Sequence, residues 1–386
     1  MKISACIIVK DELATLPACL RTLVGYIDEI IIVDTGSTDG TPYLIDAWIK
    51  ANKSETKIVQ DYFKWCDDFS AARNYAMSKA TGDWIFTVDA DDRCEISDWG
   101  PLKRFLHDPD GQLGDFDLIA CDVHNLYGKN GTVRSKLCQA RFFRTERGPA
   151  YRGAVHNQAY FPDLKRDVNA ARSSFRIYHV GYGSALSKEK LVEKGDRVLG
   201  MCKKQTRKTP KLAFAWMNYA VALKNKLSFP DSPENQHKKF IPQIHDACNK
   251  AMHYATTKQR HHFVQAVVVK GWIHYVCQEF EESNSCADQA LKEKPDFLDA
   301  LLLKGFSYTD AQRLPEAEFW LNQYLIQQKK YRFEEKFDFV PVERSDERVG
   351  VYKALAAIEL HRQHTDDAKR YSMIQGIPLE AEGALL

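Results

Sequence analysis

The stretch TVDADD, residues Thr87–Asp92, places three carboxylates within four positions directly after an apolar run. Carboxylates this close repel one another unless a cation, a bound substrate or solvent offsets their charge. The segments around this stretch indicate what kind of sheet it belongs to and which of these partners it has.

Short apolar runs alternate with helical patterns through the N-terminal part of the chain. Strands are predicted over Ile3–Val9, Glu29–Val33, Thr56–Val59 and Asp83–Val88. Helical spacing and start signals predict helices within Asp11–Leu23, from Thr41 onward, and over Phe69–Ala80. Apolar strands separated by helices predict a mostly parallel sheet that is covered on both faces.

Three of these strands end in polar segments, which begin at Lys10, Asp34 and Asp89. Ligands of parallel sheets bind outside the carboxyl ends of the strands, so the three segments together predict one site. Asp89 and Asp91 are hard oxygen ligands in small number, which suits Mg²⁺ or Mn²⁺ held partly by phosphate oxygens.

Two further groups fit a nucleotide at the same edge. Asp34 and Ser37 lie beside glycines and suit a nucleoside held by hydrogen bonds. Arg73, on the helix before the last strand, suits a phosphate. Each segment alone is also typical of a tight turn or a solvated acidic cluster, but their convergence favours a binding site.

Length and composition limit the classes of protein that remain. The chain has 386 residues, of which 44% are hydrophobic and 27% charged, which predicts two domains of an ordinary soluble protein. Its ten cysteines lack a C-x-x-C pair, which indicates buried thiols rather than a disulfide framework or a zinc site. No apolar run reaches the roughly 18–20 residues of a membrane span. We therefore expect a cytoplasmic protein without a membrane segment.

The second half of the chain is helical in pattern. The segments KGWIHYV and KGFSYTD both begin Lys-Gly-aromatic, and their glycines, Gly271 and Gly305, are 305 − 271 = 34 residues apart. This is the tetratricopeptide period, which predicts an α-helical solenoid of stacked repeats. Segments 212–223 and 351–360, with Ala368, look like flanking degenerate helices, and 328–348 is interpreted as an inserted loop.

The N-terminal segments, read together, resemble the start of a family 2 glycosyltransferase with the GT-A fold. The resemblance covers about the first quarter of the chain and is carried by ACIIVKDELATLPACLRTL, DEIIIVDTGSTDGT and FSAARNYAMSKATGDWIFTVDADD. It implies a nucleotide-sugar donor, most often a UDP-sugar, and an inverting transfer assisted by Mn²⁺ or Mg²⁺. The implied fold is a Rossmann-like α/β domain followed by the all-α repeats.

The resemblance also implies roles for individual residues. Asp34 matches the acidic residue that contacts the nucleoside base, and Arg73 the basic residue near the donor. Asp89-Ala90-Asp91 matches the DxD motif, with Asp89 toward the ribose and Asp91 toward the metal and diphosphate. His179, in IYHVGYG, resembles a His-x-Gly-Tyr element and could close the metal site, or it could be a strand-end histidine. The donor-binding candidates are Val9, Asp11, Asp34, Ser37, Arg73, Asp89 and Ala90, and the metal candidates are Asp91, Asp89 and His179.

The general base is less well indicated. The segment YRGAVHNQ resembles the acceptor side of these enzymes, but it has Asn157 where related enzymes commonly have Glu, and an amide cannot accept a proton at neutral pH. His156 is the first candidate for the base and Asp122 the second, while a structural role for either is an equal alternative. A thiolate acceptor would need no such base.

We expect three parts: a catalytic domain over 1–186, a basic linker helix over 187–210 and a repeat domain over 211–386. The first functional hypothesis is transfer of a sugar to a macromolecular acceptor such as a peptide or protein, with the repeats holding the acceptor or forming a homodimer. The basic run Lys188–Lys211 motivates a second hypothesis, transfer to modified bases in DNA. Asn157 motivates a third, a catalytically silent scaffold.

Overall fold

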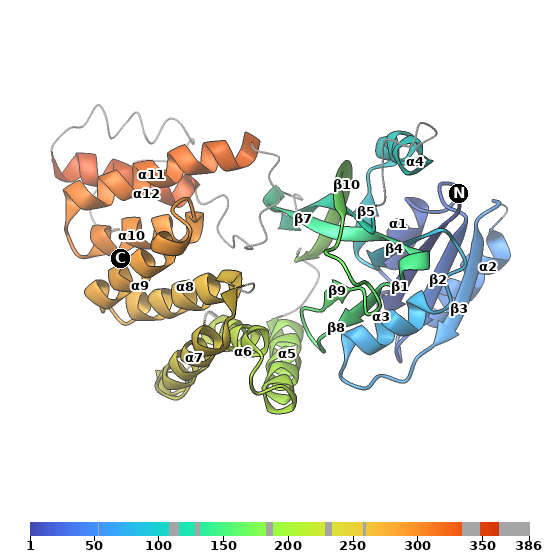
Figure 1. The fold of residues 1–386 in the computed structure, drawn as a ribbon, viewed down its shortest axis with the longest axis horizontal. Coiled ribbons are helices and arrows are strands. Elements are labelled where there is room, and N and C mark those ends of the chain that lie inside the picture. The colour runs from blue at the N-terminus through green and yellow to red at the C-terminus, as the bar shows by residue number, and fades with distance from the viewer. Residues whose placement is uncertain are drawn as a thin grey trace. The chain divides into compact units, whose positions relative to one another are not determined.

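The computed structural model describes residues 1–52, 54–107, 116–127, 132–182, 188–227, 234–257, 260–333 and 348–362. The chain divides into two compact units, Met1–Leu191 and Val192–Leu386 (Figure 1). The first is an α/β unit with a mixed sheet and the second is a run of helices, so the predicted fold class is confirmed. The division falls within helix α5, Lys188–Lys208, the segment predicted as a basic linker helix.

The first unit is built on an eight-stranded sheet with the strand order β3-β2-β1-β4-β7-β6-β10-β5. The strands are β1 Ile3–Val9, β2 Glu29–Asp34, β3 Lys57–Tyr62, β4 Trp84–Asp89, β5 Asp92–Cys94, β6 Leu118–Tyr127, β7 Thr132–Arg144 and β10 Ala170–Tyr182. A separate hairpin pairs β8, Ala150–Arg152, with β9, Gln158–Tyr160.

The predicted parallel pairing is observed among the first four strands and again between β6 and β10, whereas the other pairs of the sheet are antiparallel. β3, β2, β1 and β4 are parallel, but β7 runs antiparallel to both β4 and β6, and β5 antiparallel to β10. Only residues 128–131 separate β6 from β7, and a connection this short joins antiparallel strands. The second half of the sheet is therefore mixed.

The central strands are apolar throughout because both faces of the sheet are covered. In β2, Ile30 and Ile32 pack into the cluster that includes Leu16 of helix α1, whereas Ile31 and Val33 pack into the opposite cluster with Met77 of helix α3. Successive strand side chains point to opposite faces, so the run EIIIV supplies both cores at once.

The helices of this unit are α1 Leu16–Arg21, α2 Thr41–Ala51, α3 Phe69–Met77 and α4 Trp99–His107. α2 begins at Thr41, as predicted, with Pro42 in its first turn. α3 begins after Asp68, whose carboxylate caps it by accepting hydrogen bonds from the backbone N–H groups of Ser70 and Ala71. The helix predicted within Asp11–Leu23 is α1, which begins only at Leu16, because Asp11 has a left-handed backbone (φ 55°) within a loop.

The second unit stacks helices α6 Ala213–Leu227, α7 Glu234–Tyr254, α8 Arg260–Val276, α9 Phe280–Glu293, α10 Leu298–Asp310, α11 Leu314–Phe333 and α12 Arg348–His361 (Figure 1). The interpretation of 328–348 as a loop was wrong for 328–333, which continue α11, and for 348, where α12 begins. Residues 334–347 and Ala368 lie outside the described residues. No helix within the described ranges is long and apolar enough to cross a membrane.

A backbone repeat confirms the 34-residue period. The turn after α8 places Gln278 at φ 60°, and the turn after α10 places Gln312 at φ 58°. The bonds repeat as well: the Glu279 N–H donates to the His274 carbonyl and the Arg313 N–H to the Tyr308 carbonyl, both at 2.9 Å. Two turns with the same geometry 34 residues apart identify equivalent copies of one helical unit.

Candidate active site

An acidic cluster formed by Asp89, Asp91 and Asp92 lies at the end of β4, and the sheet brings His179 to it. Asp92 on β5 is directly opposite His179 on β10 in the antiparallel pair. The His179 Nδ1 atom lies 3.0 Å from the Asp92 carboxylate and 3.4 Å from that of Asp91. The connection between β4 and β5 therefore gathers three carboxylates around one imidazole.

Two arginines offset the charge of Asp89. One carboxylate oxygen accepts a hydrogen bond from Arg73 of α3 at 2.5 Å, and the other lies 3.3 Å from Arg141 of β7. The second guanidinium nitrogen of Arg141 lies 3.3 Å from Asp92. Arg141 thus separates two carboxylates that would otherwise repel each other.

Burial differs sharply within the cluster and sets its electrostatics. The Asp92 side chain is 0% exposed, whereas those of Asp89, Asp91 and His179 are 26%, 19% and 19% exposed. Burial opposes the charge of Asp89, but Arg73 and Arg141 hold the pKa of its carboxyl well below the usual range.

The pKa values of Asp91 and His179 are raised, unlike that of Asp89. Burial raises the pKa of the Asp91 carboxyl to about 6, an effect that His179 opposes and the neighbouring Asp89 and Asp92 strengthen. Burial lowers the pKa of His179, but the hydrogen bond to Asp92 and the nearby carboxylates outweigh it and raise the pKa overall. A cation that bound here would compete with protons on both side chains.

The cluster offers ligands for a metal ion. Ligand atoms of Asp89, Asp92 and His179 all lie within 4.8 Å of one another. Carboxylate oxygens with one imidazole nitrogen form a donor set that fits Mn²⁺ or Mg²⁺. The sequence predicted Asp91, Asp89 and His179 as the ligands, and this set has Asp92 in place of Asp91.

Asp34, at the end of β2, has one carboxylate oxygen that is hydrogen-bonded and one that is not. Its Oδ1 atom accepts hydrogen bonds from the backbone N–H groups of Gly36 at 2.7 Å and Ser37 at 2.8 Å. Its Oδ2 atom is buried and has no hydrogen-bond partner among the described residues. A buried carboxylate oxygen without a partner is costly, and a donor on a bound ligand would satisfy it.

The other donor-side candidates hold the neighbouring loops together. Ser37 Oγ accepts a hydrogen bond from the Asp11 N–H at 2.9 Å, and the Asp11 carboxylate accepts one from the Thr38 N–H at 2.6 Å. The Val9 carbonyl accepts bonds from both the N–H and the hydroxyl of Thr35. Ala90 is 4% exposed and packs in the core. Val9, Asp11 and Ser37 thus connect the loops that follow β1 and β2.

The hairpin of β8 and β9 is attached to α3 and β4. Asn74 of α3 bonds both backbone groups of Tyr151, and the Phe69 N–H donates to the Ala154 carbonyl at 3.0 Å. The Tyr151 hydroxyl is 3.1 Å from that of Thr87, and its ring lies under the Arg73 guanidinium. The hairpin loop is therefore held at the start of the helix that carries Arg73.

The two candidate bases lie in different places. His156 is exposed in this hairpin loop with φ 50°, and the side-chain nitrogen of Asn157 is buried without a hydrogen-bond partner among the described residues. Asp122 lies on β6 and pairs with Arg172 of β10 at 2.9 Å. The structure thus brings His156, but not Asp122, to the elements that carry Arg73.

Sequence reasoning assigned no individual role to Arg141, Asp92 or Tyr151, although Asp92 ends the stretch TVDADD and Tyr151 begins the segment YRGAVHNQ. Arg141 carried a usable signal, because it is the charged residue directly before Phe142 and Phe143, which are both fully buried. A charge inside an apolar strand is costly unless it is paired, which points to an acidic partner. Tyr151 carried no such signal.

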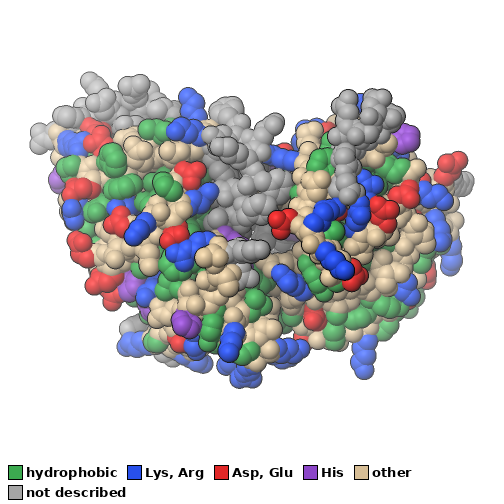
Figure 2. Space-filling model, viewed as in Figure 1, with side chains coloured by type: hydrophobic (Ala, Val, Ile, Leu, Met, Phe, Trp, Pro, Cys, Tyr) green, Lys and Arg blue, Asp and Glu red, His purple; other side chains and the backbone are tan. Residues whose placement is uncertain are grey.

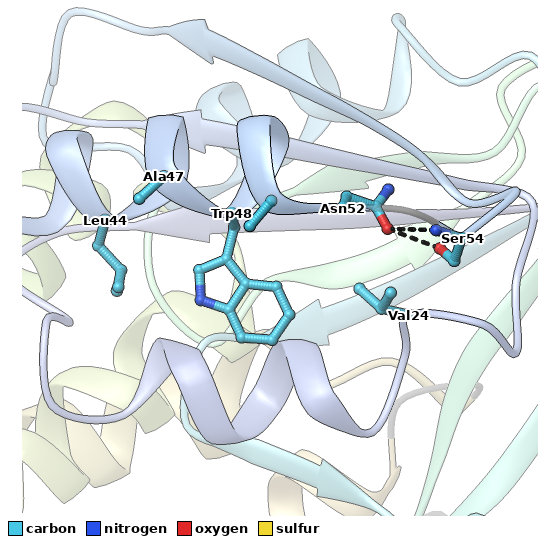
Figure 3. Close-up of a pocket in the computed structure, with 7 residues that line it drawn as sticks. Val24, Leu44, Ala47, Trp48, Asn52 and Ser54 are labelled. Carbon is cyan, nitrogen blue, oxygen red and sulfur yellow. Dashed lines mark hydrogen bonds between the residues drawn. The ribbon is translucent and has the colours of Figure 1, made fainter.

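A separate pocket of about 480 Å³ lies beside the C-terminal half of α2 (Figure 3). It is lined mainly by apolar side chains, including Val24, Leu44 and Trp48, and Figure 3 shows the Trp48 ring lying across it. The acidic cluster does not contribute to it, and its lining does not suit a charged nucleotide.

Comparison with known proteins identifies the N-terminal unit. Residues 4–163 match the family model described as Glycosyl transferase family 2. These residues form a family 2 glycosyltransferase domain, as the resemblance predicted.

Three individual proteins are similar to this chain. A TPR repeat-containing protein of Synechococcus elongatus is 41% identical over 109 residues, which are 28% of this chain and 25% of that protein. The SPbeta prophage-derived glycosyltransferase SunS of Bacillus subtilis is 26% identical over 245 residues, which are 62% of this chain and 54% of SunS. A crystal structure of S. aureus TarS in complex with UDP has a TM-score of 0.39 and 14% identity, covering 89% of this chain and 95% of that one. The chain thus spans a quarter and about half of the lengths of the two sequence relatives.

Proposed function

We propose that this protein transfers a sugar, with inversion, from a nucleotide-sugar donor to a macromolecular acceptor such as a peptide or protein. A UDP-sugar is the first donor to test, because it is the usual donor of the family that residues 4–163 match. The observation that carries the proposal is the convergence of Asp34, the Arg73–Asp89 pair and Asp91 at the carboxyl ends of β2 and β4.

The donor would lie across these strand ends. The buried Oδ2 atom of Asp34 would accept a hydrogen bond from the nucleoside base, because it has no partner among the described residues. Arg73, whose guanidinium holds Asp89 at 2.5 Å, would orient that carboxylate toward the ribose. The loops bound together by Asp11 and Ser37 would keep Asp34 in place.

Asp91, Asp89 and His179 would hold a divalent cation, since their side chains are the more exposed members of the cluster. When bound, Mn²⁺ or Mg²⁺ would neutralise the charge that develops on the leaving diphosphate. The net charge of the cluster supports this role, because Arg73 and Arg141 offset only two of its three carboxylates.

His156 is our candidate for the general base. Its loop is attached to α3 by the Phe69–Ala154 bond, whereas the carboxylate of Asp122 is paired with Arg172. A base must reach the acceptor proton within hydrogen-bond distance, which favours the residue nearer to the donor site. His156→Ala should therefore lower the transfer rate more than Asp122→Asn does.

The helical unit would hold the acceptor, since stacked tetratricopeptide-like repeats form extended binding surfaces. Figure 2 shows basic and acidic side chains interspersed on the visible face of each unit, which gives DNA as acceptor less support than a protein. Steep weakening of DNA binding with salt would reverse this preference.

Hydrolysis of UDP-, GDP- and dTDP-sugars with Mn²⁺, Mg²⁺ or EDTA tests the proposal. We expect slow metal-dependent hydrolysis of one donor, abolished in Asp91→Asn. Asp246→Asn, which changes an exposed side chain on α7 of the helical unit, is the matched control and should behave like the parent. Hydrolysis of none of the donors would favour the silent scaffold instead.

A further inference from the structure

Asp92 has a different environment from the two other carboxylates of the cluster. Its side chain is 0% exposed and both of its oxygens are engaged. Oδ2 accepts a hydrogen bond from the Asp89 N–H at 3.0 Å and lies 3.3 Å from Arg141, while Oδ1 lies 3.0 Å from His179 Nδ1. The same Nδ1 atom lies 3.4 Å from Asp91. We infer that Asp92 is a positioning residue, which fixes the ring and the tautomer of His179 in the proposed transferase.

The pairing of the strands fixes the contact between Asp92 and His179. Asp92 and His179 are opposite each other in the β5–β10 pair, so their separation is set by the ladder. Asp92 is held from its other side by Arg141, which is 6% exposed, and by the backbone of Asp89. A carboxylate fixed at both oxygens can hold the imidazole in one orientation.

The contact between Asp92 and His179 Nδ1 determines the tautomer of the imidazole. A carboxylate can only accept a hydrogen bond from a neutral imidazole, so Asp92 selects the tautomer with the proton on Nδ1. Nε2 then carries the lone pair through which the ring would bind a metal. Metal-binding histidines are commonly oriented in this way by a carboxylate behind them.

Asp92 also lies among the atoms that could themselves bind the ion. Its burial argues against direct ligation, because a cation arriving from solvent meets Asp89 and Asp91, whose side chains are 26% and 19% exposed. We therefore assign Asp92 the role of positioning His179 and not that of a metal ligand.

The inference rests on the proposed metal-dependent function, so the first measurement is independent of activity. Nitrogen-15 NMR of labelled histidine in the metal-free full chain, at alkaline pH where His179 is neutral, reports which ring nitrogen carries the proton. We expect the Nδ1–H tautomer in the parent and in Asp91→Asn, and a mixture of tautomers in Asp92→Asn. An Nε2–H tautomer in the parent would overturn the inference without any variant.

Mn²⁺ affinity, measured by calorimetry, separates a positioning residue from a ligand. Loss of a carboxylate behind a metal-binding histidine typically lowers metal affinity by about 10- to 100-fold, which we expect for Asp92→Asn. His179→Gln should show a similar loss, and the double variant should lose no more, because Asp92 acts through His179. Additive losses in the double variant, or an unchanged affinity in Asp92→Asn, would overturn the inference. Failure of the parent to bind Mn²⁺ would contradict the proposed metal dependence, whereas the tautomer would still decide whether Asp92 positions His179.

Discussion

The guanidinium of Arg141 lies 3.3 Å from the carboxylate of Asp92, and both side chains are buried beneath the more exposed part of the acidic cluster. Arg141 also lies 3.3 Å from Asp89. Removing one partner of a buried ion pair leaves an uncompensated charge. The stability of the first unit should therefore depend strongly on this arginine.

We predict that Arg141→Gln lowers the free energy of unfolding by about 3–5 kcal/mol, because Asp89 and Asp92 then lose a shared buried cation. Denaturant unfolding followed by circular dichroism measures this loss. Arg172→Gln is the control: its pair with Asp122 is about one-third exposed and should contribute only about 0–1 kcal/mol. Equal effects of the two substitutions would show that Arg141 is not the central counter-ion.

Gly271 and Gly305 should be intolerant of a methyl group. A Cβ atom at Gly271 would lie 2.6 Å from Leu303 Cδ2, and one at Gly305 would lie 2.5 Å from Leu321 Cδ2. Overpacking of this kind costs about 1–3 kcal/mol, which we expect in urea unfolding for either Gly→Ala variant. Gly200→Ala, on α5 with nothing within 4 Å, should instead stabilise its helix by about 0.5–1 kcal/mol. Destabilisation by all three would mean that helix packing is not the cause.

His262 should make the helical unit sensitive to acid. Burial, followed by the neighbouring His261, lowers the pKa of His262 from 6.5 to about 4, so the folded unit keeps this ring neutral. Between these two pH values the unfolded chain binds a proton that the folded chain does not, so stability falls as the pH falls through this window. The shift corresponds to at most about 3 kcal/mol.

His262→Leu should remove this loss, measured as the difference in unfolding free energy between neutral pH and the middle of the window. The exposed His253→Gln variant is the control and should retain the parent's pH dependence. A pH dependence that persists in His262→Leu would assign the effect to other groups.

Asp34→Asn should weaken nucleotide binding without disturbing the turn. The remaining side-chain oxygen can still accept the Gly36 and Ser37 N–H groups, but the buried Oδ2 is replaced by a donor. Hydrogen bonds to charged groups contribute about 1.5–3 kcal/mol, so affinity should fall about 10- to 100-fold. Titration with UDP measures the change, and Asp46→Asn on the exposed side of α2 should bind like the parent.

Much of the fold could be predicted from sequence, because strands and helices whose apolar residues recur with a regular period can be recognised from that period. β1 was predicted with its observed bounds, and the glycine spacing located the repeats. The antiparallel strands β7 and β5 of the mixed second half were missed, because periodicity does not report strand direction. The sequence also did not show where the loop after β1 ends. The N–H groups of Asp11 and Leu13 donate to the side chains of Ser37 and Asp39, which keeps this loop out of helix α1.

Members of the acidic cluster could be predicted from sequence where they belong to one local motif. Asp89 and Asp91 form a local motif, whereas the pairing of Asp92 with His179 depends on strands 87 residues apart along the chain. Arg141 reaches the cluster because β7 lies beside β4. One sequence does not reveal such distant pairings, so the contacts of Asp92 with His179 and Arg141 were found only in the structure.

The most direct test of the account is calorimetric titration of the parent and of Asp91→Asn with UDP, in Mn²⁺ and in EDTA. The account predicts that the parent binds UDP much more tightly in Mn²⁺ than in EDTA, and that Asp91→Asn loses this difference while keeping its fold. UDP affinity that is the same in Mn²⁺ and EDTA, or a metal effect that survives in Asp91→Asn, would contradict it.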